Sequence, residues 1–289
     1  MGKNYAIIWL ALGAIAFVDA FLCGAAGLSF SDWSRRLTLT AAIAAIGLFY
    51  HWRRRDAQIA GLAHWIVAWI AFSIAGAILT YRAARYGAAW SDETLAGLDR
   101  GLGFNWAAWF EFVNSNLPIK LVLAIAYTSL MPQILLSVIY FSWCRWDGRN
   151  CEFRANVIVA LLLTSAVFAL FPALGPGAAI PELAKLYLVD LVGLHDGSLS
   201  SFDINKLNGI VAFPSFHAVL GVLLTYAHRG GALLFPITAL NAVMLVSIPS
   251  EGGHYLIDVL AGVATAVFAI VAIRGAQLDR VNAMRPARA

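Results

Sequence analysis

Residues 58–81 read QIAGLAHWIVAWIAFSIAGAILTY, a run of 24 residues that contains no Lys, Arg, Asp or Glu. A helix of about 20 predominantly apolar residues is long enough to cross the hydrocarbon core of a bilayer. Over the whole chain of 289 residues, hydrophobic residues make up 61% and charged residues only 12%, whereas about 25% of the residues of a soluble domain are charged. The chain therefore has too little charge to cover a soluble globular surface, and we expect a helical membrane protein.

Seven other segments are similarly apolar, so the sequence predicts an all-α, polytopic membrane bundle of about eight transmembrane helices. Together the eight segments cover residues 5–29, 37–52, 58–81, 118–143, 155–174, 214–229, 232–250 and 254–274. Segment 37–52 is short and could instead form a re-entrant or interfacial helix. The first segment is too long for the core of a cleavable signal peptide and is interrupted by Asp19, so we interpret it as the first span.

The basic residues predict the orientation, because Lys and Arg gather in the cytoplasmic loops of membrane proteins. If the N-terminus is cytoplasmic, the inner segments hold twelve of the twenty Lys and Arg residues and the outer segments hold eight. Clusters such as Arg53–Arg55 then lie inside, whereas most acidic residues lie outside. We therefore expect both termini in the cytoplasm and, in a bacterial inner membrane, an outer face toward the periplasm or exterior.

Two predicted outer loops, residues 82–117 and 175–213, are too long to be simple turns. The first carries Leu95, Leu98 and Leu102 at helical spacing, as expected of an amphipathic helix in the membrane interface. The second loop shows similar spacing. We expect outer interfacial helices that form a lid or a wall for lipid access, with packed loop helices of no such role as an equal alternative.

Composition also excludes several classes of function. The Lys and Arg residues are scattered and form no basic groove, so we expect no nucleic-acid partner. The three cysteines, Cys23, Cys144 and Cys151, fit neither a disulfide framework nor a zinc site. We expect no metal and no cofactor, and the sequence leaves the oligomeric state open.

Two short segments carry the candidate chemistry, and each opens a predicted span at the outer face. They read GIVAFPSFHA at residues 209–218 and EGGHYLIDVLAG at residues 251–262. His254 and Asp258 are four residues apart and share a helix face, so the carboxylate can hold one imidazole nitrogen and leave the other free as a nucleophile or base. The alternative is a His–Asp pair that serves only to bury both side chains in the bundle.

The first of these segments has the features of a helix start that favours phosphate. Pro214 and Ser215 suit the first turn of a helix, whose free N–H groups and positive dipole attract an anion. His217 lies within that turn. If both histidines reach one membrane face, one could attack phosphorus while the other protonates the leaving oxygen, and no metal is required.

The two segments resemble the second and third signature motifs of the type-2 phosphatidic acid phosphatase superfamily. They are most similar to the branch of the inositol phosphorylceramide synthases, which are inositolphosphotransferases. The turn FPALGPG at Phe171–Gly177 is similar to a Pro-rich turn of that branch. The resemblance implies that His254 forms a phosphohistidine and that Asp258 orients it. It also implies that His217 protonates the leaving alcohol and that Ser215 helps to hold the phosphate.

The sequence departs from the superfamily motifs in its cations. Ile248 stands where the phosphatase form has an Arg six residues before the nucleophilic histidine, and the first motif is not found. The remaining outer cations are Arg100, Lys120, Lys185 and Lys206. We take Lys206, the nearest of them in sequence to the first segment, as the candidate phosphate ligand. The missing Arg is shared with the inositol phosphorylceramide synthase branch and favours transfer over hydrolysis.

These inferences combine into one expected organisation and function. We expect N-terminal membrane helices and an outer loop in 1–117, a phosphatidic acid phosphatase-like catalytic core in 118–275 and a cytoplasmic tail in 276–289. The expected activity is that of an integral membrane phosphatase or phosphotransferase whose substrate is a lipid phosphate. The alternatives are transfer of a phospho-headgroup to a ceramide-like or diacylglycerol-like lipid, and a transporter or non-catalytic membrane scaffold.

Overall fold

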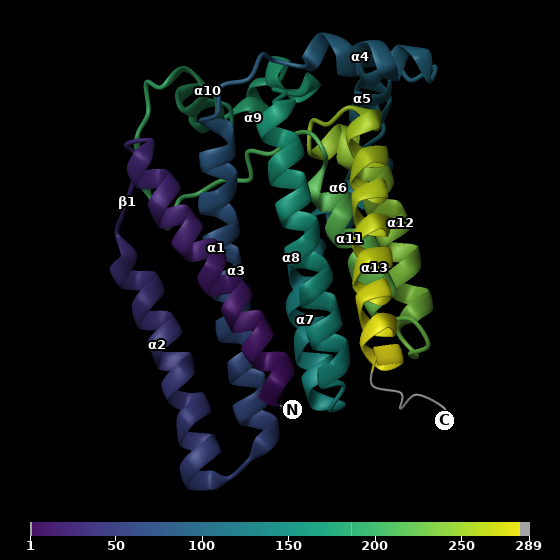
Figure 1. Ribbon diagram of the computed structural model, residues 1–289. Coiled ribbons are helices and arrows are strands. Elements are labelled where there is room, and N and C mark those ends of the chain that lie inside the picture. Colours follow the sequence, from purple (N-terminus) through teal and green to yellow (C-terminus); the bar gives the residue numbers. More distant parts are fainter. Residues whose placement is uncertain (1, 186, 284–289) are drawn as a thin grey trace.

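The computed structural model describes residues 2–185 and 187–283, and they form an almost entirely helical bundle (Figure 1). Within these residues, the β-structure is limited to β1 (Ser29–Ser31) and β2 (Ser201–Asp203). The predicted all-α fold is therefore confirmed. The long helices run side by side, and short helices gather at one end of the bundle, which we call the loop end (Figure 1).

The helices fall into three groups by length and position. The long helices are α1 (Gly2–Ala25), α2 (Trp33–Phe49), α3 (Ala57–Ala84), α8 (Asp147–Leu170), α12 (Leu234–Glu251) and α13 (Leu256–Ala283). The shorter helices of the bundle are α6 (Leu117–Thr128), α7 (Leu130–Trp143) and α11 (Phe216–Ala227). The helices of the loop end are α4 (Asp92–Gly101), α5 (Trp106–Ser115), α9 (Pro181–Ala184) and α10 (Leu188–Asp196). A π-helical turn follows α2 at Tyr50–Arg54, and a 3-10 turn precedes α9 at Pro176–Ala179.

Five helices of the described chain, α1, α3, α8, α12 and α13, are long and apolar enough to cross a membrane. Helices α6 and α7 make a sixth candidate span that is bent by 43°. The bend has a local cause, because Pro132 in the first turn of α7 has no N–H and its ring clashes with the carbonyl four residues earlier. Helices α2 and α11 have 17 and 12 residues, so the number of eight spans stays a prediction.

Helix α8 begins at Asp147, whereas the apolar pattern predicts a start at residue 155. The prediction was wrong because it followed apolar residues, and the first turns of α8 are polar but packed. The buried Arg154 donates a hydrogen bond to the carbonyl of Trp65 at 3.0 Å and lies over its ring. Glu152 forms an ion pair with Arg229. These partners inside the bundle stabilise a polar helix end that hydropathy does not predict.

A small parallel sheet of two strands, β1 and β2, links the N-terminal helices to the loop end. Strand β1 pairs with β2 in the register Ser29 to Ser201 and Ser31 to Asp203. Helices α1 and α2 both pack on α3. The sheet therefore connects the first three helices to the segment that leads into α11.

Helix α11 lies at the centre of the bundle and packs against α8, α12 and α13. Its backbone lies close to α13, where a Cβ atom on Gly262 would lie 2.4 Å from the carbonyl oxygen of Ser215 and 2.8 Å from Cβ of Ala218. Neither distance is compatible with a side chain, so the glycine allows α13 to approach the first turn of α11. This contact brings the two sequence motifs together.

Substitution of Gly262 tests this contact. We expect Gly262→Ala to force α11 and α13 apart and to destabilise the protein by about 1–3 kcal/mol, the usual cost of overpacking. Gly275→Ala is the matched control, since Gly275 lies on the same helix with open space around it. Thermal unfolding in detergent measures both variants. An unchanged midpoint for Gly262→Ala would contradict the close approach.

Candidate active site

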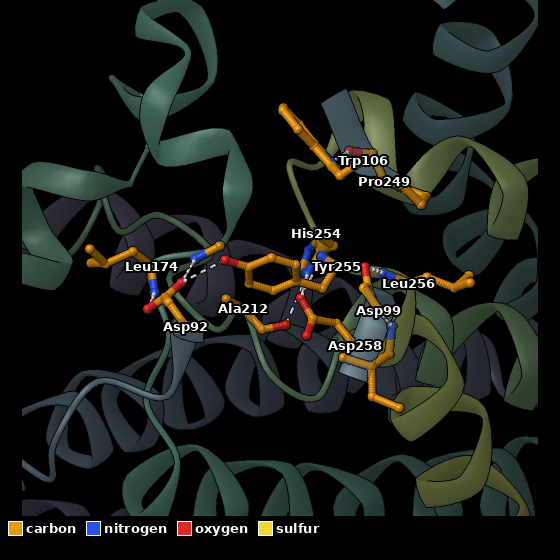
Figure 2. A network of polar contacts seen from close by, with 12 residues as sticks. Asp92, Asp99, Trp106, Leu174, Ala212, Pro249, His254, Tyr255, Leu256 and Asp258 are labelled. Carbon is orange, nitrogen blue, oxygen red and sulfur yellow. Dashed lines mark hydrogen bonds and ion pairs between the residues drawn. The ribbon is translucent and has the colours of Figure 1, made fainter. Parts of the chain in front are cut away.

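His254 is held in one orientation by two acceptors that face the same ring nitrogen (Figure 2). Its Nδ1 lies 2.9 Å from the carbonyl oxygen of Ala212 and 3.3 Å from Oδ2 of Asp258. Because a carbonyl oxygen only accepts, Nδ1 carries the proton and donates it. In the neutral ring, Nε2 then carries no proton and keeps its lone pair. This is the protonation state that a nucleophilic histidine needs.

Asp258 is fully buried and is fixed by the backbone around it. Its Oδ2 accepts a hydrogen bond from the N–H of Tyr255 at 2.9 Å, so the carboxylate caps the start of its own helix. The carbonyl oxygen of Asp258 accepts from the N–H of Ser215 at 3.0 Å. Asp258 therefore links the starts of α11 and α13 while it faces His254.

His217 lies on the first turn of α11, and its ring stacks on that of Tyr127 with 4.5 Å between centroids and 11° between planes. His217 and His254 line one cavity of about 480 Å³, which we call the histidine cavity. Its walls come from α3, α6, α7, α8, α9 and α11, from Tyr187 and from the segments at 207–211 and 251–254. The structure thus brings both predicted histidines to one space.

The two predicted phosphate ligands have different positions. Ser215 immediately precedes α11, and its buried hydroxyl has no hydrogen-bond partner, although Ser215 does not line the cavity. Lys206 is 83% exposed, pairs with Asp203 at 3.3 Å and does not line the cavity either. Ser215 thus lies at the start of the helix that carries His217, whereas Lys206 is a solvent-exposed residue paired with Asp203.

Asp99 on α4 holds the helix that follows His254, and the sequence motifs do not reveal it. This buried carboxylate accepts hydrogen bonds from the N–H groups of Leu256 and Ile257, both at 2.8 Å (Figure 2). These amides open α13 and have no partner within the helix, and a negative charge is favourable at that end of the helix dipole. The signal in the sequence is an acidic residue among the apolar positions of an amphipathic segment.

Helix α5 holds the other side of the His254 loop. The indole N–H of Trp106 donates to the carbonyl of Pro249 at 2.9 Å (Figure 2). Pro249 lies in the last turn of α12, where helix carbonyls lack partners within the helix. Helices α4 and α5 therefore fix the end of α12 and the start of α13, and the loop with His254 lies between them.

The Pro-rich turn at Phe171–Gly177 packs against the same loop. The N–H of Gly177 donates to the carbonyl of Gly253 at 3.2 Å, and a Cβ on Gly177 would lie 2.7 Å from Cα of Gly253. Asp92 on α4 accepts hydrogen bonds from the N–H groups of Leu174 and Gly175 at 2.9 and 2.8 Å (Figure 2). The two glycines allow this close backbone contact, through which the Pro-rich turn supports the loop that carries His254.

Two tyrosines of this region stay protonated and serve as donors. Burial, with the charges of Asp92 and Asp258, raises the pKa of Tyr187 to about 12. The same causes raise the pKa of Tyr255 above its usual range. The hydroxyl of Tyr187 donates to the carbonyl of Leu174 at 2.7 Å, and that of Tyr255 lies 3.4 Å from Asp92. Both phenols therefore position the loops and do not act as bases near neutral pH.

The histidine cavity has an unusual charge for a phosphate site. None of the described residues that line it is Lys or Arg, and Glu251 is the acidic residue among them. In residues 2–185 and 187–283, no three His, Cys, Asp or Glu side chains gather as metal ligands would. The groups available to an anion are the two histidines and the first turn of α11.

Sequence comparison identifies the class to which this site belongs. Residues 93–272, more than half of the chain, match the sequence profile of the PAP2 superfamily, and the chain belongs to that superfamily. Members are generally phosphatases or phosphotransferases. No curated protein and no solved structure matches the chain. The matched region contains both histidine motifs and Asp99, and the inositol phosphorylceramide synthase branch stays a prediction.

Removal of the Asp99 carboxylate tests the support of α13. We expect Asp99→Ala to destabilise the first turn of α13 by about 1–2 kcal/mol, as loss of a helix cap does. Hydrogen exchange in the segment with Leu256 and Ile257 should become faster. Thr94→Ala, an exposed change on the same helix, is the control and should not alter exchange. Equal exchange in both variants would show that Asp99 does not hold this turn.

Proposed function

We propose that this chain is an integral membrane lipid-phosphate phosphatase or phosphotransferase that uses His254 as its nucleophile. The observation that carries the proposal is the hydrogen-bonded Nδ1 of His254, which leaves Nε2 free in a cavity shared with His217. Membership of the PAP2 superfamily supports phosphoryl chemistry. The distribution of Lys and Arg favours an active site at the outer face of the membrane.

The proposed reaction has two steps that share the same groups. In the first, Nε2 of His254 forms a bond to phosphorus while the bond from phosphorus to the oxygen of the lipid alcohol breaks. His217, whose protonated form is favoured by the bound phosphate anion, gives that oxygen a proton. In the second, the oxygen of water or another alcohol forms a bond to phosphorus while the bond from phosphorus to Nε2 of His254 breaks, and the attacking oxygen gives its proton back to His217. This step releases phosphate or the phosphorylated alcohol and restores both histidines. Asp258 stabilises the positive charge that develops on the His254 ring.

The first turn of α11 is the proposed phosphate site. The N–H groups at the start of a helix lack acceptors within it and carry the positive end of the dipole. Ser215 precedes this turn, and its buried hydroxyl, which has no hydrogen-bond partner among the described residues, is the proposed side-chain donor to a phosphate oxygen. Preorganised donors of this kind stabilise the charge that develops on phosphorus in the transition state.

The walls of the histidine cavity favour a lipid substrate. On α3, α7 and α11 the lining is mainly apolar, with Phe72, Ile134 and Leu220 among its residues. Ser73 on α3 and Met131 on α7 line the cavity and are also exposed, so we place the entrance for a lipid chain beside these two residues. A chain in the bilayer could enter there while its phosphate reaches the histidines. We propose that the substrate approaches laterally from the membrane.

Substitution of each histidine tests the mechanism. We expect His217→Ala to slow release of phosphate or transfer of a headgroup about 10²–10⁴-fold, the usual contribution of a general acid. His254→Ala should abolish the phosphoenzyme seen with a ³²P-labelled lipid. Turnover by the unaltered protein should continue in chelator. His51→Ala, an exposed change at the opposite end of the bundle, should have no effect. Unchanged turnover in both site variants would disprove the mechanism.

Filling the cavity tests the lateral path. Ala77 lines the cavity on α3, and we expect Ala77→Trp to lower kcat/KM for a long-chain lipid phosphate about tenfold, because several methylene groups lose their apolar contacts. A short-chain, water-soluble phosphoester should be turned over nearly as before. Ile70→Trp, on the same helix outside the cavity lining, is the control. An equal loss for both substrates would argue against this path.

A further inference from the structure

Glu251 is the feature of the histidine cavity that the proposed reaction does not use. It is the last residue of α12, three positions before His254, and it lines the cavity while partly exposed. Its carboxylate makes no hydrogen bond or ion pair to any described residue. A phosphate that reaches the histidines therefore comes near a carboxylate with no partner.

Opposing charge is weak in this part of the site. Lys120 on α6 is the cation that acts electrostatically on Glu251, but it lies beyond ion-pair distance, is exposed and does not line the cavity. The carboxylate also acts on the hydroxyl of Tyr127, whose ring stacks on His217. Glu251 is thus close enough to influence the reacting groups while its own charge is incompletely balanced.

Two consequences follow from an unbalanced carboxylate beside a phosphate site. Repulsion between like charges grows in proportion to the charge of the ligand, so a dianionic phosphomonoester is disfavoured twice as strongly as a monoanionic phosphodiester. A carboxylate is also an acceptor only, and its hydrogen bonds to hydroxyl or ammonium groups are stronger than those of a neutral acceptor. Together, the two effects favour a monoanionic phosphodiester that carries hydrogen-bond donors.

We propose that Glu251 is a specificity-determining residue that selects a lipid phosphodiester whose headgroup carries hydrogen-bond donors. The donors are hydroxyl or ammonium groups next to the phosphate, and Glu251 accepts from them while the chain of the lipid lies in the apolar part of the cavity. This inference rests on the proposed function. It adds a residue that discriminates between substrates and plays no part in breaking the bond to phosphorus.

The test compares lipids that differ only in the headgroup. Purified protein is incubated with phosphatidylcholine vesicles that contain phosphatidate, phosphatidylglycerol or phosphatidylethanolamine. Glu251→Gln should lower kcat/KM about tenfold for the diester that the unaltered protein uses best and raise it several-fold for phosphatidate. A larger loss with phosphatidylethanolamine identifies ammonium as the donor, and a larger loss with phosphatidylglycerol identifies hydroxyl. Glu111 is an exposed acidic residue on α5, and Glu111→Gln is the control that should leave kcat/KM unchanged for the diester and for phosphatidate.

A binding measurement separates failure of this inference from failure of the proposed function. Orthovanadate, an analogue of phosphate in its transition state, should inhibit or bind Glu251→Gln several-fold more tightly than the unaltered protein, because the repelling charge is gone. If the unaltered protein neither binds vanadate nor turns over any of the lipids, the proposed function is wrong. Suppose instead that the unaltered protein binds vanadate or turns over one of the lipids. If Glu251→Gln then changes kcat/KM for monoester and diester and the affinity for vanadate all in the same way, or changes none of them, the proposed role of Glu251 is wrong. Unchanged thermal unfolding shows that the variant is folded.

Discussion

The hydrogen bond from Nδ1 of His254 to the carbonyl of Ala212 is the contact on which the site depends. It joins the loop before α13 to the loop before α11, two segments that the sequence separates by about forty residues. It also sets the tautomer, since a backbone carbonyl accepts under all conditions, whereas a carboxylate alone could exchange roles with the ring. Asp258 then acts on a ring whose orientation is already fixed. The fold alone therefore fixes the orientation of the His254 ring.

Carboxylates from the loop end keep that contact in place. Asp92 and Asp99, seven residues apart on α4, bind backbone N–H groups of the Pro-rich turn and of α13. Each supplies the acceptors that a loop or helix start cannot find within itself. Trp106 on α5 also donates to the carbonyl of Pro249. Helices α4 and α5 thus form a clamp, by which we mean that they hydrogen-bond to both sides of the loop that carries His254. The amphipathic helices of this end are therefore structural parts of the site as well as candidates for contact with the membrane surface.

The sequence predicts the apolar helices well and singles out the candidate site residues, because both depend on local spacing. The distance of four residues between His254 and Asp258 and the Pro-Ser start of α11 are visible without a structure. The clamp is not, since Asp99 meets Leu256 across 157 residues, and an acid in an amphipathic segment usually faces water. Hydropathy also misses the polar first turns of α8, where Arg154 is buried against Trp65. The position of Asp99 and the start of α8 depend on partners that are distant in sequence, and the periodicity of apolar residues cannot predict such partners.

The parallel pairing of β1 and β2 has a consequence for the order in which the molecule is assembled. Ser29 leaves the ribosome 172 residues before its partner Ser201. Strand β1 therefore has no partner until α8, α9, α10 and then β2 have been synthesised. Segment 207–211, which follows β2 and forms one wall of the histidine cavity, takes its place only then. The histidine cavity therefore cannot be complete until most of the chain has been synthesised.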